Sequence, residues 1–270
     1  MALKFQSLAS GSSGNCYYLG TDDYGILLDA GVSVRSLRKV LKENGIGLEQ
    51  IMAVFITHEH ADHIRSVGSL GEKYGIPVYT TKTIHEGIDN SIYVDAKLYT
   101  SRRIIEKEIA VSIKDLKITA FDVPHDANEC VGYLIAYKHH KLVLITDAGH
   151  INEKVGEYIR IANHLIIETN YDREMLLKGK YPPFLKKRIS CGYGHLCNSE
   201  TAEFLAANFD LHLKNIWLCH LSKDNNHPEL AYKTVEMAMQ QYGIRIGKDV
   251  NLTALKRTTP SEMYILDDSF

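Results

Sequence analysis

Four side chains that can bind a metal ion fall within six consecutive positions of this sequence: His58, His60, Asp62 and His63. They follow an apolar run, residues 52–56, that is typical of a buried β-strand. Imidazoles and carboxylates are ligands that zinc and similar cations prefer. His58 and His60 project to the same side of an extended chain, while Asp62 and His63, where a helix should begin, can face a second position beside it. Two adjacent cations held in this way would form a hydrolytic centre.

A cluster this tight cannot complete two coordination shells, so further ligands are expected elsewhere in the chain. Four other apolar runs end in side chains of the same kind, namely Asp29 after 24–28, His125 after 117–124, Asp147 after 141–146 and His220 after 215–219. Functional residues collect where strands pass into loops, because the sheet is rigid and the loops can vary. The sequence therefore predicts one site assembled from strand ends that are far apart in the chain.

In this order the residues resemble the motifs of the metallo-β-lactamase superfamily, from residue 3 to about residue 220. The resemblance implies an α+β fold, the four-layer αββα sandwich of that superfamily. It also implies two divalent metal ions, one held by His58, His60 and His125, the other by Asp62, His63 and His220, with Asp147 bridging them. Asp29 would orient the histidine loop from behind the ligands. A turn or cap residue before Gly31 is the competing explanation for Asp29.

A narrower resemblance, to the YycJ (WalJ) branch of the superfamily, covers almost the whole chain. It is carried by residues 10–16, 168–172, 175–176, 194–198 and 221–226. Members of the branch are bacterial and cytosolic, and they are linked to DNA metabolism as proposed 5′-to-3′ exonucleases. This sequence departs from the branch at Tyr171 and Cys197, where we expect His and Ser. Neither is a presumed metal ligand, so the departures bear on substrate contacts alone.

The composition is that of an ordinary globular protein, with 45 % hydrophobic and 24 % charged residues among 270. Because the ligands span residues 58–220, we expect a single domain over residues 1–270. No apolar run approaches the ~20 residues of a membrane span, and the N-terminus has no secretory pattern. Five cysteines without CxxC spacing indicate reduced, structural thiols, with Cys197 the best candidate for an exception. We therefore expect a cytoplasmic protein.

The net charge of −2 provides no global positive field for nucleic acid, so a polyanionic substrate would need a local basic patch. Lys186, Lys187 and Arg188 precede His195 and are candidate phosphate contacts, with a solvated helix face as the competing explanation. Weaker candidate substrate contacts are Ser12, Ser13, Asn15, Asn225 and Asn226. The first three could simply form a tight Gly/Ser turn. The last two could instead form a turn or support His220.

Local signals outline the elements that must position these residues. Ser33 is expected to cap a helix that runs to Asn44 and stops at Gly45. A second helix is expected from His63 to Tyr74, and the region 98–137 is β-rich. Further helices are expected from Asn152, from Asp172, from Asn198 to Asn208 and over 228–242, with strands at 165–167, 215–219 and 251–255, the last closing the chain. Mixed sheets packed face to face with helices outside would satisfy this pattern.

The expected site favours an anionic substrate such as a phosphodiester. Two divalent cations, two carboxylates and a bridging hydroxide leave a net charge of about +1, and metal binding lowers the pKa of water to ~7. We expect this hydroxide to attack phosphorus in line. His195, oriented by Glu168, is expected to protonate the leaving oxygen, which makes Asp62, His195 and Glu168 the candidate catalytic residues. A backbone-bonded loop histidine and a strand-end ion pair are the competing explanations for His195 and Glu168.

These observations predict a dinuclear metal-dependent hydrolase, a phosphodiesterase or 5′-to-3′ exonuclease that acts on DNA in preference to RNA, or on a small phosphodiester. Zinc suits the ligands best, with manganese or iron as alternatives. The main alternative is a small-molecule hydrolase acting on a thioester, lactone or cyclic phosphodiester, because a fold does not determine the substrate. A redox di-iron protein or a binding module is a third class. The intact ligand set argues against pure binding, and the chain has no room for a flavin domain.

Overall fold

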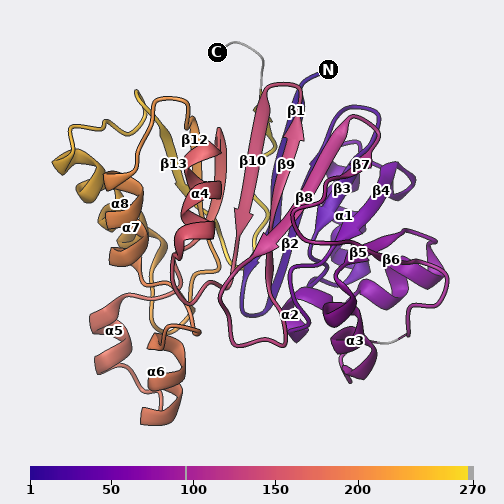
Figure 1. Cartoon of the computed structure of the whole chain (residues 1–270), viewed down its shortest axis with the longest axis horizontal. Helices are drawn as coiled ribbons and strands as arrows, with labels where there is room; N and C mark the ends of the chain where they lie inside the picture. Colours follow the sequence, from indigo (N-terminus) through magenta and orange to yellow (C-terminus); the bar gives the residue numbers. More distant parts are fainter. Residues whose placement is uncertain (95, 267–270) are drawn as a thin grey trace. The chain divides into compact units, whose positions relative to one another are not determined.

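The computed structural model describes residues 1–94 and 96–266. Within them the chain forms two compact units. Of the described residues, the first unit comprises 1–94, 96–106, 127–129 and 256–266, and the second comprises 107–126 and 130–255. Each unit contains one sheet in which seven strands are described, and Figure 1 shows these strands and the helices that accompany them.

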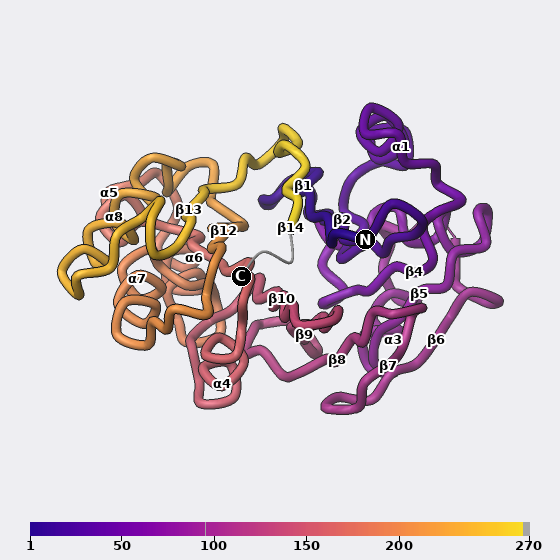
Figure 2. The backbone as a smooth tube through the Cα atoms, turned by 90° about the horizontal axis from the view of Figure 1, so that it is seen from above, coloured from indigo at the N-terminus to yellow at the C-terminus, as the bar shows by residue number. Residues whose placement is uncertain are grey.

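The sheet of the first unit has the strand order β14-β1-β2-β3-β4-β5-β6. Its strands are β1 (Leu3–Gly11), β2 (Gly14–Gly20), β3 (Gly25–Leu28), β4 (Ile51–Phe55), β5 (Val78–Thr80), β6 (Arg102–Ile104) and β14 (Tyr264–Leu266). β14, β1, β2 and β3 pair antiparallel, and β3 to β6 pair parallel. β1 and β2 form a hairpin around the Gly/Ser turn. Figure 2 shows β14 beside β1, so the prediction that a strand at 251–255 closes the chain is wrong. Three residues are too short a strand to show periodicity.

Three helices accompany this sheet. α1 (Val34–Glu43) is the predicted amphipathic helix, since Ser33 caps it and Leu37, Val40 and Leu41 are buried. α3 (Lys82–Asn90) begins at a Thr81 cap. The single helix predicted from 63 to 74 is wrong, because the structure divides it into α2 (Ala61–Ile64) and a wider π-helical turn (Ser69–Lys73). That turn is tied to a distant segment, because Glu72 accepts hydrogen bonds from the amides of residues 99–101.

The sheet of the second unit has the order β13-β12-β11-β10-β9-β8-β7. Its strands are β7 (Val111–Ile113), β8 (Leu116–Asp122), β9 (Val131–Tyr137), β10 (His140–Ile145), β11 (His164–Glu168), β12 (Asn215–Cys219) and β13 (Asn251–Ala254). β10 to β13 run parallel, so their carboxyl ends lie along one edge. Asp147, Glu168 and His220 lie at or just beyond these ends.

Helices α4 (Glu153–Ile161), α7 (Asn198–Ala207) and α8 (Pro228–Gln241) cover this second sheet through an apolar core that includes Val143, Leu165 and Leu218. α5 (Arg173–Lys178) and α6 (Pro183–Ser190) extend beyond the carboxyl ends of the strands (Figure 1). The predicted helix starts at Asn152 and Asp172 are confirmed, since both side chains cap their helices. In the described part of the chain, no helix has the length and apolarity needed to cross a membrane.

Candidate metal centre

In the first unit, the histidine motif is anchored by Asp29, a fully buried residue just beyond β3. Asp29 accepts hydrogen bonds from the Thr57 amide at 2.9 Å, from Thr57 Oγ1 at 3.0 Å and from His63 Nδ1 at 2.7 Å. Thr57 Oγ1 also lies 3.0 Å from His58 Nδ1. An ionised carboxylate can only accept, so His63 carries its proton on Nδ1 and its Nε2 retains a lone pair. Asp29 therefore orients the motif so that it can bind a cation.

Asn15, at the start of β2, marks the point where two candidate ligands converge. Its Nδ2 donates to Asp62 Oδ2 at 3.2 Å and to His63 Nε2 at 3.0 Å. The ring of His58 lies 4.6 Å from that of His60 and 4.1 Å from that of His63, centroid to centroid. Three imidazoles and one carboxylate thus gather on this unit, a ligand set that suits zinc. The sequence suggested Asn15 as a phosphate contact, whereas the structure places its amide against the ligands.

Close backbone packing positions Asp62. A Cβ at Gly31 would lie 1.6 Å from the Asp62 carbonyl oxygen and 2.6 Å from the Asn15 amide nitrogen. Only a glycine allows this approach, so Gly31 accounts for the contact between the segment after β3 and the start of α2. Glu59, within the same motif, lies outside the cluster, because its Oε1 accepts from the amide of Asn128 at 2.9 Å.

In the second unit, the fully buried carboxylate of Glu168 is bound by four donors. Its Oε1 accepts from Nδ1 of His195 and of His220, each at 2.8 Å, and its Oε2 accepts from the amides of Ala148 and Leu196 at 2.9 and 3.0 Å. Burial alone would raise the pKa of Glu168, but the imidazole partners outweigh burial and lower it. Burial by itself would lower the pKa of His195, but the neighbouring Glu168 carboxylate outweighs burial, so the pKa of His195 is raised. In both imidazoles the contact with Glu168 uses Nδ1, so Nε2 is the nitrogen that would serve a ligand or substrate.

Asp147 lies at the centre of this second group. Its Oδ1 is 3.2 Å from His220 Nδ1, 3.7 Å from His195 Nδ1 and 3.9 Å from His125 Nε2. His125 Nδ1 lies 3.0 Å from the carbonyl oxygen of Gly194, which can only accept, so His125 also retains a lone pair on Nε2. Ligand atoms of Asp147, Glu168, His195 and His220 all lie within 4.8 Å of one another. The structure thus brings His195 and Glu168 among the candidate ligands, which the sequence did not reveal.

Three of these residues have a left-handed backbone, with φ of 60° at Asp29, 51° at Asp147 and 53° at His220. Residues other than glycine rarely adopt this conformation, which costs about 1–3 kcal/mol each and persists where the surroundings impose it. Such strain gathers at functional sites. All three follow strand ends, so both sheets deliver a side chain through the same unusual turn.

The remaining candidates from the turns differ in exposure. Ser12 and Ser13 are exposed between β1 and β2, whereas Asn225 and Asn226 are buried. Asn226 Nδ2 donates to the two carbonyl oxygens of residues 169–170 at 2.8 and 3.0 Å. For Asn226 this geometry favours support of the loops at the strand ends over contact with a substrate.

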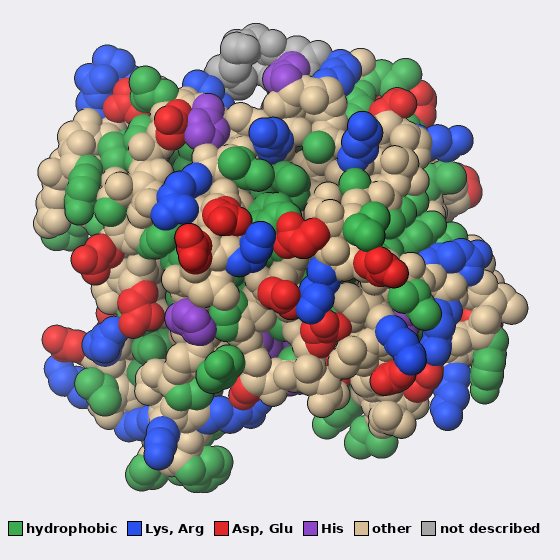
Figure 3. Space-filling model, viewed as in Figure 1, with side chains coloured by type: hydrophobic (Ala, Val, Ile, Leu, Met, Phe, Trp, Pro, Cys, Tyr) green, Lys and Arg blue, Asp and Glu red, His purple; other side chains and the backbone are tan. Residues whose placement is uncertain are grey.

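The basic candidates on α6 are engaged to different degrees. Lys186 Nζ donates to the Leu177 carbonyl oxygen at 2.7 Å, and Arg188 Nε donates to Asp126 Oδ2 at 2.5 Å. Lys187 is exposed, and α6 has no buried residue. Figure 3 shows basic and hydrophobic side chains together at the lower left, where Figure 1 has α5 and α6. Lys186 and Arg188 therefore take part in local contacts, and α6 presents Lys187 at its surface.

The two departures from the branch pattern contact each other. Tyr171 and Cys197 form a backbone bridge, are both buried and pack with Leu176 of α5. The Arg173 guanidinium lies 3.6 Å from Cys197 Sγ. These residues therefore attach α5 to the loop before α7. All five cysteines lie in the described part of the chain and are thiols, and Cys191 alone among them is exposed.

Residues 24–220 match the family model of the beta-lactamase superfamily domain. The chain belongs to this superfamily. This superfamily member is 36 % identical over 249 residues to exodeoxyribonuclease YycJ of Bacillus anthracis, covering 92 % of this chain and 93 % of the relative. It has the same identity and coverage with exodeoxyribonuclease WalJ of Streptococcus pneumoniae. Among solved structures, the metallo-β-lactamase fold protein YhfI of Bacillus subtilis matches with a TM-score of 0.73 at 16 % identity, over 98 % of this chain and 100 % of that one.

These comparisons confirm the predicted α+β metallo-β-lactamase fold and the resemblance to the YycJ (WalJ) branch. The superfamily member is a metal-dependent hydrolase. Its histidine and aspartate clusters, together with the family, indicate that it binds divalent metal.

Proposed function

We propose that this hydrolase is a phosphodiesterase that digests nucleic acid as a 5′-to-3′ exonuclease, with DNA favoured over RNA. The observation that carries the proposal is the Glu168–His195 pair, in which Glu168 holds Nδ1 of His195 at 2.8 Å and leaves Nε2 available. Cleavage of a phosphodiester releases an alkoxide that needs a proton, whereas a thioester releases a less basic thiolate that has less need of a dedicated donor. The two relatives that cover most of the chain are named exodeoxyribonucleases, which agrees with this chemistry.

We further propose that both units contribute ligands, so that residues 1–270 act as one hydrolase domain. His58, His60 and His125 would hold one divalent ion, Asp62, His63 and His220 the other, and Asp147 would bind both. Within each unit, acceptors on Nδ1 of His63, His125 and His220 leave Nε2 as the ligand atom, a common arrangement at metal sites. Zinc suits this donor set best, with manganese or iron as alternatives.

When bound, divalent ions would polarise the phosphoryl oxygens and make water a better nucleophile near neutral pH. The residues of the chain do the positioning. Asp29 holds the first histidine group, and Glu168 holds His195 and His220. His195 Nε2 is then the group that passes a proton to the leaving sugar oxygen. The five thiols support a cytoplasmic location, which we propose together with this function.

The test is an activity measurement on purified protein whose metal content has been analysed. The substrates are 5′-labelled single- and double-stranded DNA and RNA together with bis-p-nitrophenyl phosphate, each with zinc, manganese or EDTA. Stepwise, metal-dependent release from the 5′ end of DNA is the expected result. Hydrolysis of the small diester without any cleavage of polymer would overturn the nuclease proposal in favour of a small-molecule phosphodiesterase. Failure to cleave any diester with metal bound would overturn the phosphodiester chemistry and favour thioesters or lactones.

A further inference from the structure

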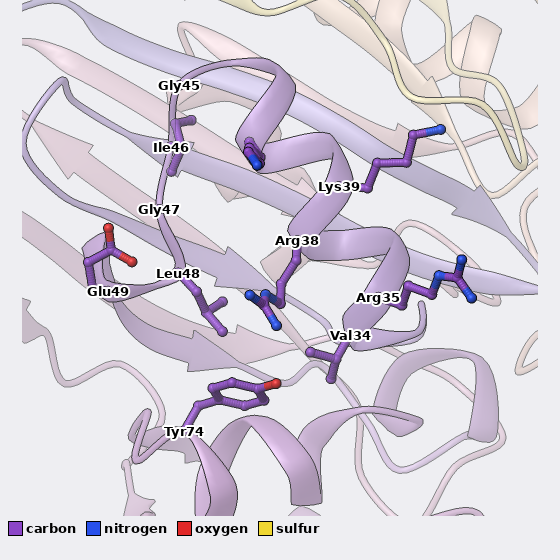
Figure 4. Close-up of a pocket in the computed structure, with 11 residues that line it drawn as sticks. Val34, Arg35, Arg38, Lys39, Gly45, Ile46, Gly47, Leu48, Glu49 and Tyr74 are labelled. Carbon is purple, nitrogen blue, oxygen red and sulfur yellow. The ribbon is translucent and has the colours of Figure 1, made fainter.

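Two hollows flank α1 in the first unit. The first, about 800 Å³, lies between α1, the loop at 45–49 and Tyr74, as Figure 4 shows. The second, about 420 Å³, lies between α1, the turn at Ser13 and Gly14, and the segment 257–260. α1 is therefore the shared wall of two open depressions.

Among the charged side chains that line the two hollows, cations outnumber carboxylates. The cations that line them are Arg35, Arg38, Lys39, Lys42, Arg65 and Arg257, and the lining carboxylates are Glu43 and Glu49. Figure 4 shows Arg38 directed toward Leu48 and Tyr74, and Arg35 and Lys39 directed away from them. Six cations against two carboxylates make this surface locally positive, although the whole chain carries a net charge of −2.

The fold of α1 accounts for only one of its four cations, because Lys42 lies in the last turn, where the helix dipole favours positive charge. Arg35 and Lys39, like Arg38 and Lys42, are spaced i and i+4, where like charges destabilise a helix. Arg35 also lies in the first turn, where the helix dipole disfavours positive charge. Lys39 lies 3.9 Å from Glu43, but this ion pair is exposed and contributes little. Binding of an anion explains a charge pattern that costs the helix stability.

Two parts of the second hollow's lining lie next to the first group of candidate ligands in the sequence, since Gly14 precedes Asn15 and Arg65 follows His63 by two positions. The wall of this hollow at Ser13 and Gly14 continues directly into Asn15, whose Nδ2 donates to Asp62 and His63. Hydroxyl side chains that can bind phosphate oxygens line the same hollow, at Ser13, Ser33, Ser36 and Thr258. A chain that enters the metal centre could therefore continue over α1.

We propose that the α1 basic surface, defined as Arg35, Arg38, Lys39, Lys42, Arg65 and Arg257, binds the phosphate backbone of a polynucleotide beyond the bond that is cleaved. This inference rests on the proposed nuclease function and specifies how a chain of net negative charge holds a polyanion. Contacts of this kind position a strand without reading its sequence. Tyr74, in the first hollow, offers an aromatic face on which a base can stack.

The test compares two variants that each lose four positive charges. The α1 variant carries Arg35→Ala, Arg38→Ala, Lys39→Ala and Lys42→Ala. The charge-matched control carries Lys117→Ala, Lys141→Ala, Lys233→Ala and Lys248→Ala, at four lysines that are exposed in the second unit. Alanine is the best helix former and removes the repulsion within α1, so the variant should fold, which thermal melting verifies. We expect kcat/KM on labelled single-stranded DNA to fall about tenfold or more. The slope of log(kcat/KM) against log salt concentration should become less negative by about 3, because each phosphate of a single strand that a side chain neutralises contributes about 0.7 to this slope. Hydrolysis of bis-p-nitrophenyl phosphate should be unchanged.

The outcomes separate this inference from the proposed function. If the wild type digests DNA and the α1 variant shows the same salt dependence and KM, the surface is not a backbone site. Equal losses in the control, or a parallel loss of small-diester hydrolysis, would also overturn it. A wild type that cleaves the diester but no polynucleotide overturns the nuclease proposal instead. In that case, fluorescence anisotropy measures whether the wild type binds the same oligonucleotide, which stays uncleaved. Absence of binding would overturn the proposed role of the α1 basic surface.

Discussion

At the scale of single residues, two buried carboxylates determine which nitrogen of the neighbouring imidazoles carries the proton. Asp29 does this for His63, and Glu168 does it for His195 and His220. The role of Asp29 follows from a family resemblance, and the pairing of Glu168 with His195 follows from their expected chemistry. The second contact of Glu168, with His220, carries no sequence signal, because the two residues are 52 positions apart.

His195→Ala should lower kcat on a polynucleotide about 10²–10⁴-fold, the usual contribution of a general acid, while the metal content stays unchanged. Steady-state kinetics and elemental analysis of the purified variant measure the two effects. His139→Ala, at an exposed histidine in a turn, is the matched control. Because His195 lies within 4.8 Å of the candidate ligands, loss of metal from the variant would instead make it a ligand.

Asp29→Asn should weaken metal binding about 10–100-fold, as loss of an orienting hydrogen bond behind a ligand typically does. Asparagine tolerates the left-handed backbone at this position, so the change isolates the acceptor. The buried donors of Thr57 and His63 would lose one acceptor oxygen, which costs about 1–3 kcal/mol of stability. Metal titration and denaturant unfolding of the metal-free protein measure the two effects. Wild-type affinity in the variant would show that Asp29 is only a turn residue.

At the scale of elements, strand ends and one glycine contact position the candidate site residues. Asp29, Asp147 and His220 leave β3, β10 and β12 through left-handed turns. Gly31 then lets the segment after β3 approach the start of α2 within a distance that excludes any side chain. The elements are thus ordinary, and the unusual geometry is confined to their ends.

Gly31→Ala should destabilise the protein by about 3 kcal/mol or more, at the upper end of overpacking costs, because its Cβ would meet the Asp62 carbonyl oxygen at 1.6 Å. Gly45→Ala is the control. Gly45 has φ of 73° with open space around it, so that change should cost only about 1–2 kcal/mol of backbone strain. Urea unfolding measures both, and equal costs would contradict the close packing at residue 31.

Glu72→Gln should show how the π-helical turn is held. A hydrogen bond from the Ser101 side chain, joined by amides of residues 99–101, lowers the pKa of Glu72 from 4.5 to about 2. Because the folded-state pKa is depressed, this stabilisation is fully present above about pH 4.5 and is lost as the pH falls toward 2. The variant should therefore be less stable than the wild type at neutral pH, with the difference shrinking over that window. Unfolding curves of both proteins between pH 2 and 7 measure this. A difference in unfolding free energy that stays constant over this range would contradict the role of Glu72.

At the scale of the whole molecule, the proposed ligands come from both units, so metal binding should stabilise the chain as a whole. Because metal binds only the folded protein, it raises the free energy of unfolding by about 4 kcal/mol when the free metal concentration is about a thousand times its dissociation constant. EDTA should therefore lower the melting temperature and abolish hydrolysis, and added zinc or manganese should restore both. Calorimetry of the apo and reloaded protein measures this. An unchanged melting temperature after verified metal removal would contradict binding by both units.

The sequence by itself determined the residue types of the candidate ligands, most of the strands and helices that carry them, and the superfamily. Those signals are local: the Ser33 cap, the apolar face of α1 and the run of four ligands after β4 all lie within about a dozen residues. Only the tertiary structure decided that Glu168 serves both His195 and His220, that Gly31 packs on Asp62, that β14 pairs with β1, and that Arg65 and Arg257 join the cations of α1. Each of these depends on segments distant in the chain, whose contacts follow from three-dimensional packing rather than from any local pattern.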